Sequence, residues 1–523
     1  MRGGDALRNL ARAAVVAIGA VYAWHNRFYV NPDGVAYFDV ADTFLARGWF
    51  ASIHTHRSPL FPWLLAMANR LVRPRAYDES TVAHGVMFLL YCLAFVALEC
   101  LLAQLRKAKE LEGMPDALWI PLAYGLFLWS CNFADETGPS LLTPDLLVAA
   151  AVFAGSALLV RIAGGARGWP AWTALGLVVG LGYLAKEAML PIAIFLLAAA
   201  AIAGGRRVLL SAVLFAAIAC AYIVPLSIKL GHFSTGETKR YNLIMWVAAE
   251  GKPIHAVPVL FRNPTIVGYP DGAGRGMTSV HDDLRYWLEG VRPRFDLRAQ
   301  LRAIGKSAVA YVRILGAPLH FALLAVFLVL LGRFGAASLK RFWVLTVPSL
   351  LTLAMYGAVL VQPRYIAPSL TVLWIGLFAG FGAEAARFAA RATAVLSIVV
   401  VLVAGYLNRD ELRQLFDPAV NDNWLVAQAL ARAGVRPGDR VASVGEPFMC
   451  YWARLAKVRI AAEVRNPATF WKLDATTRAA AEAAVQRYRV RALVAENAPD
   501  EPPPEFESVD ETSYAVCVLP VKR

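Results

Sequence analysis

The chain has 523 residues, of which 58% are hydrophobic and only 17% are charged. Soluble domains carry roughly 25% charged residues, and the apolar residues here form long blocks, so the sequence predicts a polytopic membrane protein. The formal charge of +14 would suggest nucleic-acid binding if it covered a soluble surface. From Asn408 onward, however, 16 basic side chains balance 16 acidic ones. The excess lies in short clusters between apolar runs, which argues against nucleic acid as a partner.

The first apolar run follows Arg2, Arg8 and Arg12 and ends in bulky residues, where a signal-peptide cleavage site needs small ones. We therefore expect a retained first span over about residues 8–25. The loop that follows, 26–83, has apolar residues at helical spacing in "VAYFDVADTFL". This pattern predicts an amphipathic helix that lies along the membrane interface. A second such helix is expected to begin at Ser58-Pro59, an N-cap followed by a residue suited to the first helical position.

Ten further spans are expected after this loop. The stretch from Ala171 to Gly204 is long enough for one span or two. It must hold two if the basic clusters on either side of it are both cytoplasmic, and Lys186 and Glu187 then lie at the outer tip of a hairpin. The expected spans are about 84–105, 117–133, 143–163, 171–186, 188–203, 208–230, 306–332, 341–361, 365–388 and 392–407.

This topology predicts about 11 transmembrane helices over residues 1–407, with the N-terminus cytoplasmic, interfacial helices in the first outer loop and a large outer loop at 231–305. Residues 408–523 are expected to form a separate soluble α/β domain on the extracytoplasmic side. In this domain "VRPGDRVASVG" and "VRALVAEN" predict strands, and "TTRAAAEAAVQRYRV" predicts a helix. Spacing alone leaves open whether Cys450 and Cys517 form a disulfide there.

Two acidic residues near predicted membrane boundaries are candidate catalytic groups. Asp33 lies in "NPDG", a turn signature in which Asp bonds to the local backbone, and the alternative is a general base that faces an outer cavity. Asp145, in "SLLTPDLLVAA", either caps a helix together with Thr143 and Pro144 or supplies a second carboxylate. Both interpretations stay open for both residues.

The basic residues at the outer boundaries are candidate phosphate ligands. Arg364, in "VQPRYIAPSL", opens a helix on the outer side, where both the helix dipole and the positive-inside tendency disfavour a cation. It therefore needs an anionic partner, either a phosphate or a protein carboxylate. Lys186 suits either a phosphate or a structural role beside Glu187. The full set of candidate substrate-binding residues is Arg57, Lys186, Arg364, Tyr365, Asp39 and His56.

Five stretches, in this order, resemble the GT-C class of membrane glycosyltransferases, which includes the dolichyl-phosphate-mannose protein mannosyltransferases and the bacterial lipid A aminoarabinose transferase. The resemblance covers the membrane part to about residue 407. It implies that the first-loop Asp, matched by Asp33, activates the acceptor and that the donor is a polyprenyl-phosphate sugar. Many relatives have Asp-Glu where this chain has Asp33-Gly34, so a second carboxylate would come from Asp39 or Asp145. The stretches are "PDGVAYFDVADTFLARG", "RSPLFPWLLA", "TPDLLVAA", "GLGYLAKEAMLPIA" and "PRYIAPSL".

The residues and the resemblance together predict a glycosyltransferase of the bacterial inner membrane. It would transfer a sugar from a polyprenyl phosphate to an extracytoplasmic glycan, lipid or protein by one inverting displacement. The sequence requires no cofactor, and a divalent cation stays open, because His54 and His56 are a weak metal pattern without further ligands. The alternatives are a transporter or flippase of lipid-linked sugars, which would place charges deep in the spans, and a membrane-anchored assembly or sensing protein.

Overall fold

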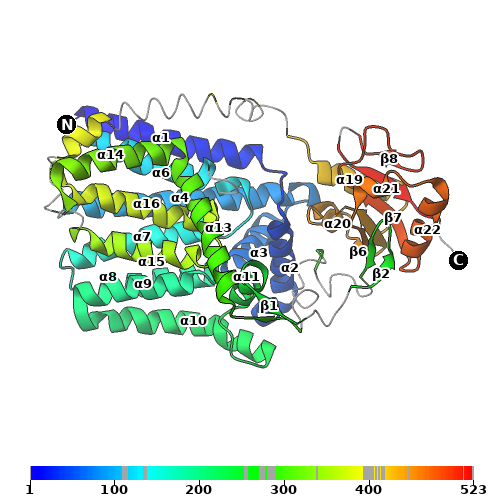
Figure 1. The fold of residues 1–523 in the computed structure, drawn as a ribbon, viewed down its shortest axis with the longest axis horizontal. Coiled ribbons are helices and arrows are strands. Elements are labelled where there is room, and N and C mark those ends of the chain that lie inside the picture. Colours follow the sequence, from blue (N-terminus) through cyan, green and yellow to red (C-terminus); the bar gives the residue numbers. More distant parts are fainter. Residues whose placement is uncertain are drawn as a thin grey trace.

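A bundle of long helices and a mixed sheet domain make up this computed structural model (Figure 1). The structure describes residues 2–108, 116–133, 138–251, 257–269, 277–279, 290–336, 340–383, 385–392, 406, 409, 413, 419–445, 447–510 and 512–520. The sheet domain lies beyond one end of the bundle (Figure 1). That end is called the domain end below, and the opposite end, where the chain begins, is called the N-terminal end.

The bundle helices run side by side along one direction (Figure 1). Within an apolar helix every central backbone group is hydrogen-bonded, which is what a lipid environment requires. Among the long apolar helices α7 is the most buried, because α4, α8, α9 and α16 pack against it. The bundle helices are α1 (Arg2–His25), α4 (Glu79–Lys107), α5 (Asp116–Trp119), α6 (Gly125–Leu128), α7 (Asp145–Ala163), α8 (Trp169–Ala185), α9 (Met189–Gly204), α10 (Val208–Leu230), α14 (Pro318–Phe334), α15 (Trp343–Gly357) and α16 (Pro363–Gly380).

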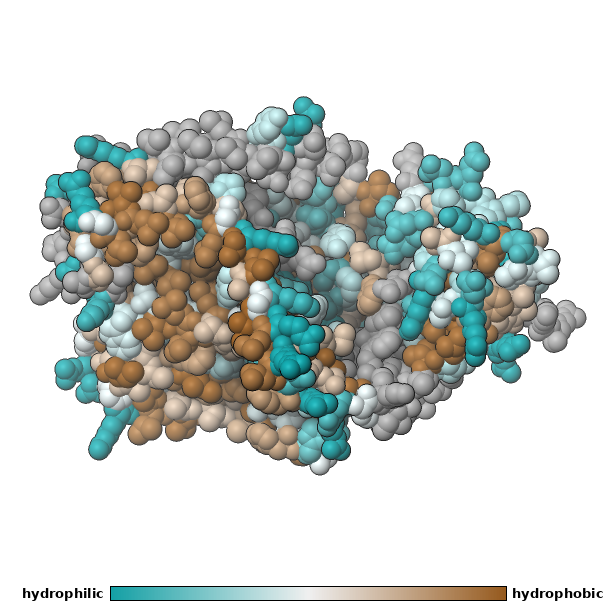
Figure 2. Space-filling model, in the orientation of Figure 1, coloured by the Kyte–Doolittle hydropathy of each residue, from teal (hydrophilic) through white to brown (hydrophobic). Residues whose placement is uncertain are grey.

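Among the described residues, four helical segments are long and apolar enough to cross a membrane: Asp5–His25, Ala76–Lys107, Asp145–Ala163 and Met189–Leu230. These segments indicate a multi-pass membrane protein, and Figure 2 shows a largely hydrophobic surface over the bundle. Other bundle helices, among them α8 and α15, are apolar but shorter. The number of about eleven spans therefore stays a prediction, and the span expected at 392–407 lies almost wholly outside the described residues.

The question of one span or two between Ala171 and Gly204 is answered by two helices. Helices α8 and α9 are separated by residues 186–188, so Lys186 and Glu187 lie at the tip of a hairpin, as the charge pattern predicted. The tip is at the domain end of the bundle (Figure 1). Loop charges therefore gave the correct connectivity where hydropathy alone did not.

The stretch expected to form one continuous span at 306–332 is broken in the structure. This stretch belongs to two helices, α13 (Leu297–Gly316) and α14, whose axes are bent by 83°. Ala317 has extended backbone angles and Pro318 begins α14. The cause is that a proline pushes the preceding residue out of the helical conformation. Helix α13 consequently runs across the domain end of the bundle instead of along it (Figure 1).

Three more helices lie between the bundle and the sheet domain: α2 (Pro32–Ser52), α3 (Leu60–Val72) and α11 (Thr238–Trp246) (Figure 1). Both helices expected in the first loop are present. "NPDG" is not a turn, however, because α2 already begins at Pro32 and has Asp33 in its first turn. The side chain of Asn31 makes no cap and instead accepts a hydrogen bond from the backbone of Leu142 (2.9 Å). Helix α3 begins at Leu60, one residue later than expected.

The sheet of the C-terminal domain has the strand order β2-β3-β6-β5-β7-β9-β8. The strands expected at β5 and β7 and the helix expected at α22 are confirmed. Strands β2 and β3 come from the loop after α10, and β3 pairs antiparallel with β6 (Ile266 opposite Val464), so residues outside 408–523 complete the sheet. Cys450 and Cys517 are both buried, and no disulfide joins the two. The elements are β2 (Val259–Phe261), β3 (Ile266–Gly268), α19 (Asp422–Arg432), β5 (Arg440–Val444), α20 (Tyr451–Leu455), β6 (Arg459–Val464), α21 (Pro467–Phe470), α22 (Ala475–Gln486), β7 (Val490–Ala495), β8 (Glu507–Ser508) and β9 (Ala515–Val518), with β1 (Ala249–Glu250) and β4 (Arg292–Pro293) as a separate pair.

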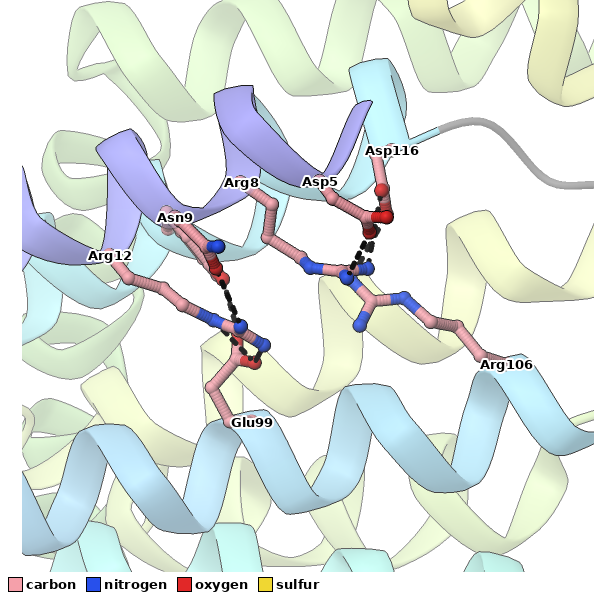
Figure 3. A network of polar contacts seen from close by, with 8 residues as sticks. Asp5, Arg8, Asn9, Arg12, Glu99, Arg106 and Asp116 are labelled. Atoms are coloured by element: carbon pink, nitrogen blue, oxygen red, sulfur yellow. Dashed lines mark hydrogen bonds and ion pairs between the residues drawn. The ribbon is translucent and has the colours of Figure 1, made fainter. Parts of the chain in front are cut away.

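Ion pairs fasten α1 to its neighbours near the N-terminal end (Figure 3). Arg12 pairs with Glu99 of α4. Asp116, the first residue of α5, accepts a hydrogen bond from Arg8 of α1 (3.3 Å) and forms an ion pair with Arg106 of α4 (3.1 Å). Charges beside apolar helices are tolerated when they neutralise one another, as they do here. These pairs hold the first helix in the bundle at the end far from the predicted site residues.

Candidate functional site

The domain end of the bundle brings most of the predicted site residues together. They come from five separate parts of the chain, each at the end of a helix or in a tip between helices. This placement is expected of a site, because side chains at helix ends can face a shared opening without breaking the helices. The residues are Asp33 (first turn of α2), Arg57 (between α2 and α3), Asp145 (first residue of α7), Lys186 (tip between α8 and α9), and Arg364 and Tyr365 (first turn of α16).

Asp33 and Arg57 form the first ion pair of the site. The Nη1 of Arg57 donates to the Oδ1 of Asp33 at 2.7 Å. The guanidinium carbon of Arg57 also lies 5.2 Å from the ring centroid of Tyr37, one turn further along α2, a cation–π arrangement that restrains the arginine. The side chain of Asp33 is 35% exposed and that of Arg57 14%. The carboxylate is therefore held in place and still accessible.

Asp145 and Lys186 form the second ion pair. The Nζ of Lys186 donates to the Oδ1 of Asp145 at 2.5 Å and lies 4.2 Å from the ring centroid of Tyr365. This pair joins α7, the α8–α9 tip and α16. Helix α7 begins at Asp145, and Pro144 before it makes no side-chain cap, so the expected capping by Thr143 is wrong. The other oxygen of Asp145, Oδ2, is buried, and no donor among the described residues reaches it.

Arg364 is a half-buried cation close enough to both ion pairs to interact electrostatically with their carboxylates. Its Nη2 donates to the hydroxyl of Tyr365 and its Nε to the side-chain oxygen of Gln362, each at 3.2 Å. The negative charges of Asp145 and Asp33 both act on its guanidinium. The ring of Tyr365 stacks on that of Tyr356 (5.7 Å between centroids) and so fixes the first turn of α16. The three cations thus share one region with the two carboxylates.

Two tyrosines that the sequence analysis missed lie beside Asp33. Burial raises the pKa of Tyr37, and the positive charge of Arg57 opposes this shift. Burial also raises the pKa of Tyr241 in α11. The negative charge of Asp33 raises this pKa further, and the positive charge of Arg57 lowers it. Both phenols therefore stay protonated at neutral pH and keep a hydrogen to donate. Helical spacing was a usable signal for Tyr37, four residues after Asp33, whereas Tyr241 reaches the site only through the tertiary fold.

The segment after α10 contacts both the hairpin tip and the loop between α2 and α3. Glu187 is buried and accepts from the backbone of Thr238 (2.9 Å), while the hydroxyl of Thr238 donates to the carbonyl of His56 (3.1 Å). Gly236 is needed beside this contact, because it has φ +130° and a Cβ there would collide with the Glu187 carboxylate. Glu187 thus holds the loop, and Lys186 pairs with Asp145 rather than with its neighbour.

Two predicted substrate-binding residues have other contacts in the structure. Asp39 is only 3% exposed and bonds to Arg454 of the sheet domain (2.9 Å) and to the backbone of Thr278 (2.6 Å). The ring of His56 packs edge-on against that of His54 (4.7 Å between centroids). A substrate role for either residue stays a prediction without a supporting contact. Across the part of the chain that the structure describes, no group of three or more His, Cys, Asp or Glu residues is placed to hold a metal ion.

Among the described residues of the site, three cations lie near two carboxylates. The cations are Arg57, Lys186 and Arg364, and the carboxylates are Asp33 and Asp145. A phosphate matches the fork of a guanidinium such as that of Arg364. A groove of about 600 Å³ opens next to it, between α13 and residues Val361 and Pro363, which directly precede Arg364. The arrangement can therefore bind a phosphate and offer a carboxylate base close by.

The solved structures that the fold matches are GT-C glycosyltransferases. One is ArnT from Cupriavidus metallidurans, in the apo state (13% identity, 98% of each chain covered, TM-score 0.42) and bound to undecaprenyl phosphate (14% identity, 98% of this chain and 97% of that chain, TM-score 0.41). Another is the oligosaccharyltransferase AglB from Archaeoglobus fulgidus, in complex with an inhibitory peptide and a dolichol-phosphate (12% identity, 92% of this chain and 69% of that chain, TM-score 0.44). No family model matches the chain, and no curated protein is significantly similar to it in sequence. At these identities and TM-scores the likeness gives no information on what this chain binds or does.

Proposed function

We propose that this protein is a membrane glycosyltransferase that moves a sugar from a polyprenyl-phosphate donor to an extracytoplasmic acceptor. The observation that carries the proposal is the pairing of Asp33 with Arg57 and of Asp145 with Lys186 beside Arg364. Transfer from a phosphate needs one group that accepts a proton and several that stabilise a leaving anion. The site supplies both kinds within one cluster.

Each residue has a distinct role in the proposed reaction. Asp33 accepts the proton of the acceptor hydroxyl or amine as that atom attacks the sugar. Arg364, Lys186 and Arg57 stabilise the charge that develops on the departing polyprenyl phosphate. Asp145 is a positioning residue, because its contact holds Lys186 against the ring of Tyr365. One bond forms to the sugar as the bond to the phosphate breaks, so the anomeric configuration inverts.

The proposed topology has about eleven spans, with the N-terminus in the cytoplasm and the domain end on the outer side of a bacterial inner membrane. The bundle helices near the site then border a lipid environment. A membrane-bound donor can therefore reach Arg364 sideways, while a glycan, lipid or protein acceptor approaches from outside. The sheet domain, which includes residues 408–523, lies on that outer side as well.

The direct test is turnover of a defined donor by the purified full-length protein in lipid nanodiscs. An undecaprenyl-phosphate sugar is supplied, and release of undecaprenyl phosphate and of the inverted sugar product is measured, with water as the acceptor if no other is known. We expect turnover above that of empty nanodiscs. Movement of the intact donor between leaflets without its cleavage would support the transporter alternative and contradict the proposal.

Replacing Arg364 by Gln is expected to weaken donor turnover by about tenfold to hundredfold, since a charge-assisted hydrogen bond is worth about 1.5–3 kcal/mol. The measurement is kcat/KM for the lipid-linked sugar. Arg262, an exposed arginine in the turn between β2 and β3, provides the control when changed to Gln. Equal kcat/KM values for the two variants would show that Arg364 does not bind the donor phosphate.

We expect turnover to continue when divalent cations are removed with a chelator. The physical reason is that Arg57, Lys186 and Arg364 already supply the positive charge that a metal would bring to a leaving phosphate. Turnover is measured in EDTA before and after Mg²⁺, Mn²⁺ or Ca²⁺ is added back. Loss of turnover in EDTA that one of these ions restores would show that the cations of the site are insufficient by themselves.

A further inference from the structure

Helix α13 has two exposed faces of opposite character. Side chains three, four or seven positions apart share a face of a helix. On the first exposed face Leu301 and Val312 are 58% and 71% exposed. On the other, the exposed cations follow one another at helical spacing, and no carboxylate occurs between residues 297 and 316. The exposed cations are Arg298, Arg302, Lys306 and Arg313.

The rest of the molecule holds α13 flat against the end of the bundle. The side chain of Gln300 donates a hydrogen bond to the backbone carbonyl of Ala358, and the hydroxyl of Tyr311 donates one to the backbone carbonyl of Leu353, each at 2.5 Å. The small residues Ala299 and Ala303 are buried and allow close approach. A hydrophilic strip therefore crosses the surface at the domain end of the bundle, next to the hydrophobic surface of the helices (Figure 2). A helix with this placement and composition is typical of a membrane interface.

The position of the cations calls for an anionic partner. In the proposed topology α13 lies on the outer side, where the positive-inside tendency disfavours lysine and arginine. Among the described residues, the carboxylate whose charge acts on these cations is Asp296, the residue before α13, and it acts on Arg302. Acidic headgroups at a membrane surface attract such segments, and each basic side chain near them strengthens binding by about fivefold.

The groove between α13 and the start of α16 gives this surface a specific form. Lys306 and Arg313 lie on its α13 wall, and its volume is about 600 Å³. The remaining lining is apolar or small: Gly305, Val309, Ala310, Ile314, Val361 and Pro363. Cations beside an apolar channel match a molecule that has a phosphate at the end of a hydrocarbon chain. Neither a free inorganic ion nor a peptide would use both parts of this surface.

We propose that this groove is a binding site for an anionic phospholipid of the outer leaflet. The headgroup phosphate contacts Lys306 and Arg313, and part of an acyl chain occupies the apolar lining. The site uses none of the ion-paired residues assigned to sugar transfer. It rests on the proposed function only for the outer placement of the domain end, so a loss of lipid binding and a loss of sugar transfer are measured separately. A polyprenyl phosphate shares the same chemistry, and the test below distinguishes it from a phospholipid.

The test compares lipid binding by the full-length protein and a double variant, Lys306→Gln with Arg313→Gln. Phosphatidylglycerol is titrated onto the detergent-purified protein, and bound lipid is counted by native mass spectrometry. Two cations at about fivefold each predict a loss of affinity of about 25-fold. The matched control is Arg206→Gln with Arg207→Gln, two exposed arginines between α9 and α10, which is expected to bind like the unchanged protein. The charge-retaining pair Lys306→Arg with Arg313→Lys is expected to bind like the unchanged protein as well, and excludes a folding defect as the cause.

Three results would overturn the proposal. The first is equal phosphatidylglycerol affinity in the double variant and the unchanged protein. The second is tighter binding of undecaprenyl phosphate than of phosphatidylglycerol at the same residues, which would assign the groove to the donor lipid. The third is full competition by inorganic phosphate, which would show that the apolar lining takes no part.

Discussion

Replacing Asp33 by Asn is expected to lower donor turnover by about 10²- to 10⁴-fold, the range that a general base contributes. Asparagine keeps the size of the side chain and its position in the first turn of α2, but it cannot accept a proton at neutral pH. The measured quantities are kcat and KM for the polyprenyl-phosphate sugar. Because Asp33 acts on the acceptor, the loss should appear in kcat, with KM for the donor changed little.

Asp42 supplies a matched control for this experiment. It lies in the same helix, its side chain is 55% exposed, and its partner is Arg454 of the sheet domain rather than Arg57. Asp42→Asn is expected to leave kcat near that of the unchanged protein. If Asp33→Asn were as active as Asp42→Asn, Asp33 would not be the general base, and the assembly or sensing alternative would gain support.

The fold brings together most of the charged residues that the sequence singled out, but the sequence did not predict how they pair. Asp33, Asp145 and Arg364 could be selected because each is a charged group at a membrane boundary, which is a local signal. The pairing of Arg57 with Asp33 spans 24 residues and that of Lys186 with Asp145 spans 41. Contacts at such separations depend on how helices pack, and one sequence contains no direct record of that packing.

The contacts of Asp39 show why residue type alone was insufficient. Both Asp33 and Asp39 are acidic residues of α2, and residue type alone does not show which of them is covered by another part of the fold. Six residues along a helix correspond to a rotation of roughly 240°, so the two carboxylates point to different faces, whereas Tyr37 lies within roughly 40° of Asp33. The face of Asp39 is covered by Arg454, which is 415 residues away in the chain. Only the fold reveals that neighbour.

The break between α13 and α14 was missed for a different reason. Hydropathy averaged over a long window combines the weakly apolar α13 with the strongly apolar α14 and predicts one continuous span. Pro318 was the available signal, because the residue before a proline is disfavoured in a helix. Likewise, nothing in the short strands β2 and β3 indicated that they complete a sheet whose other strands lie almost 200 residues further along the chain.

Replacing Arg454 by Met is expected to destabilise the attachment of the sheet domain by about 3–5 kcal/mol, the usual cost of leaving buried charges unpaired. Arg454 bonds to Asp39 of α2 (2.9 Å) and to Glu79 of α4 (2.7 Å), and these carboxylates are 4% and 15% exposed. Methionine fills a similar volume but removes the positive charge that both carboxylates contact. The measurement is denaturant unfolding of the full-length protein, followed by the fluorescence of the tryptophans in the sheet domain.

An exposed arginine in the same domain provides the comparison. Arg432 pairs with Asp510 at 3.5 Å, and the two side chains are 65% and 53% exposed, so Arg432→Met should change stability by less than about 1 kcal/mol. Neutralising the two carboxylates as well, with Asp39→Asn and Glu79→Gln added to Arg454→Met, is expected to restore much of the lost stability. Equal unfolding curves for the Arg432 and Arg454 variants would show that the buried pairs contribute nothing.

Arg454→Met should also lower kcat, because α2 carries both Asp39, which contacts Arg454, and Asp33. Loosening the Arg454 contact frees the face of α2 that packs on the sheet domain, and Asp33 is then held mainly by Arg57. We expect kcat of Arg454→Met to fall under conditions in which the protein is still folded, and the variant with Asp39→Asn and Glu79→Gln to regain stability without regaining full kcat. Recovery of both together would mean that the domain contact stabilises the protein but does not position Asp33.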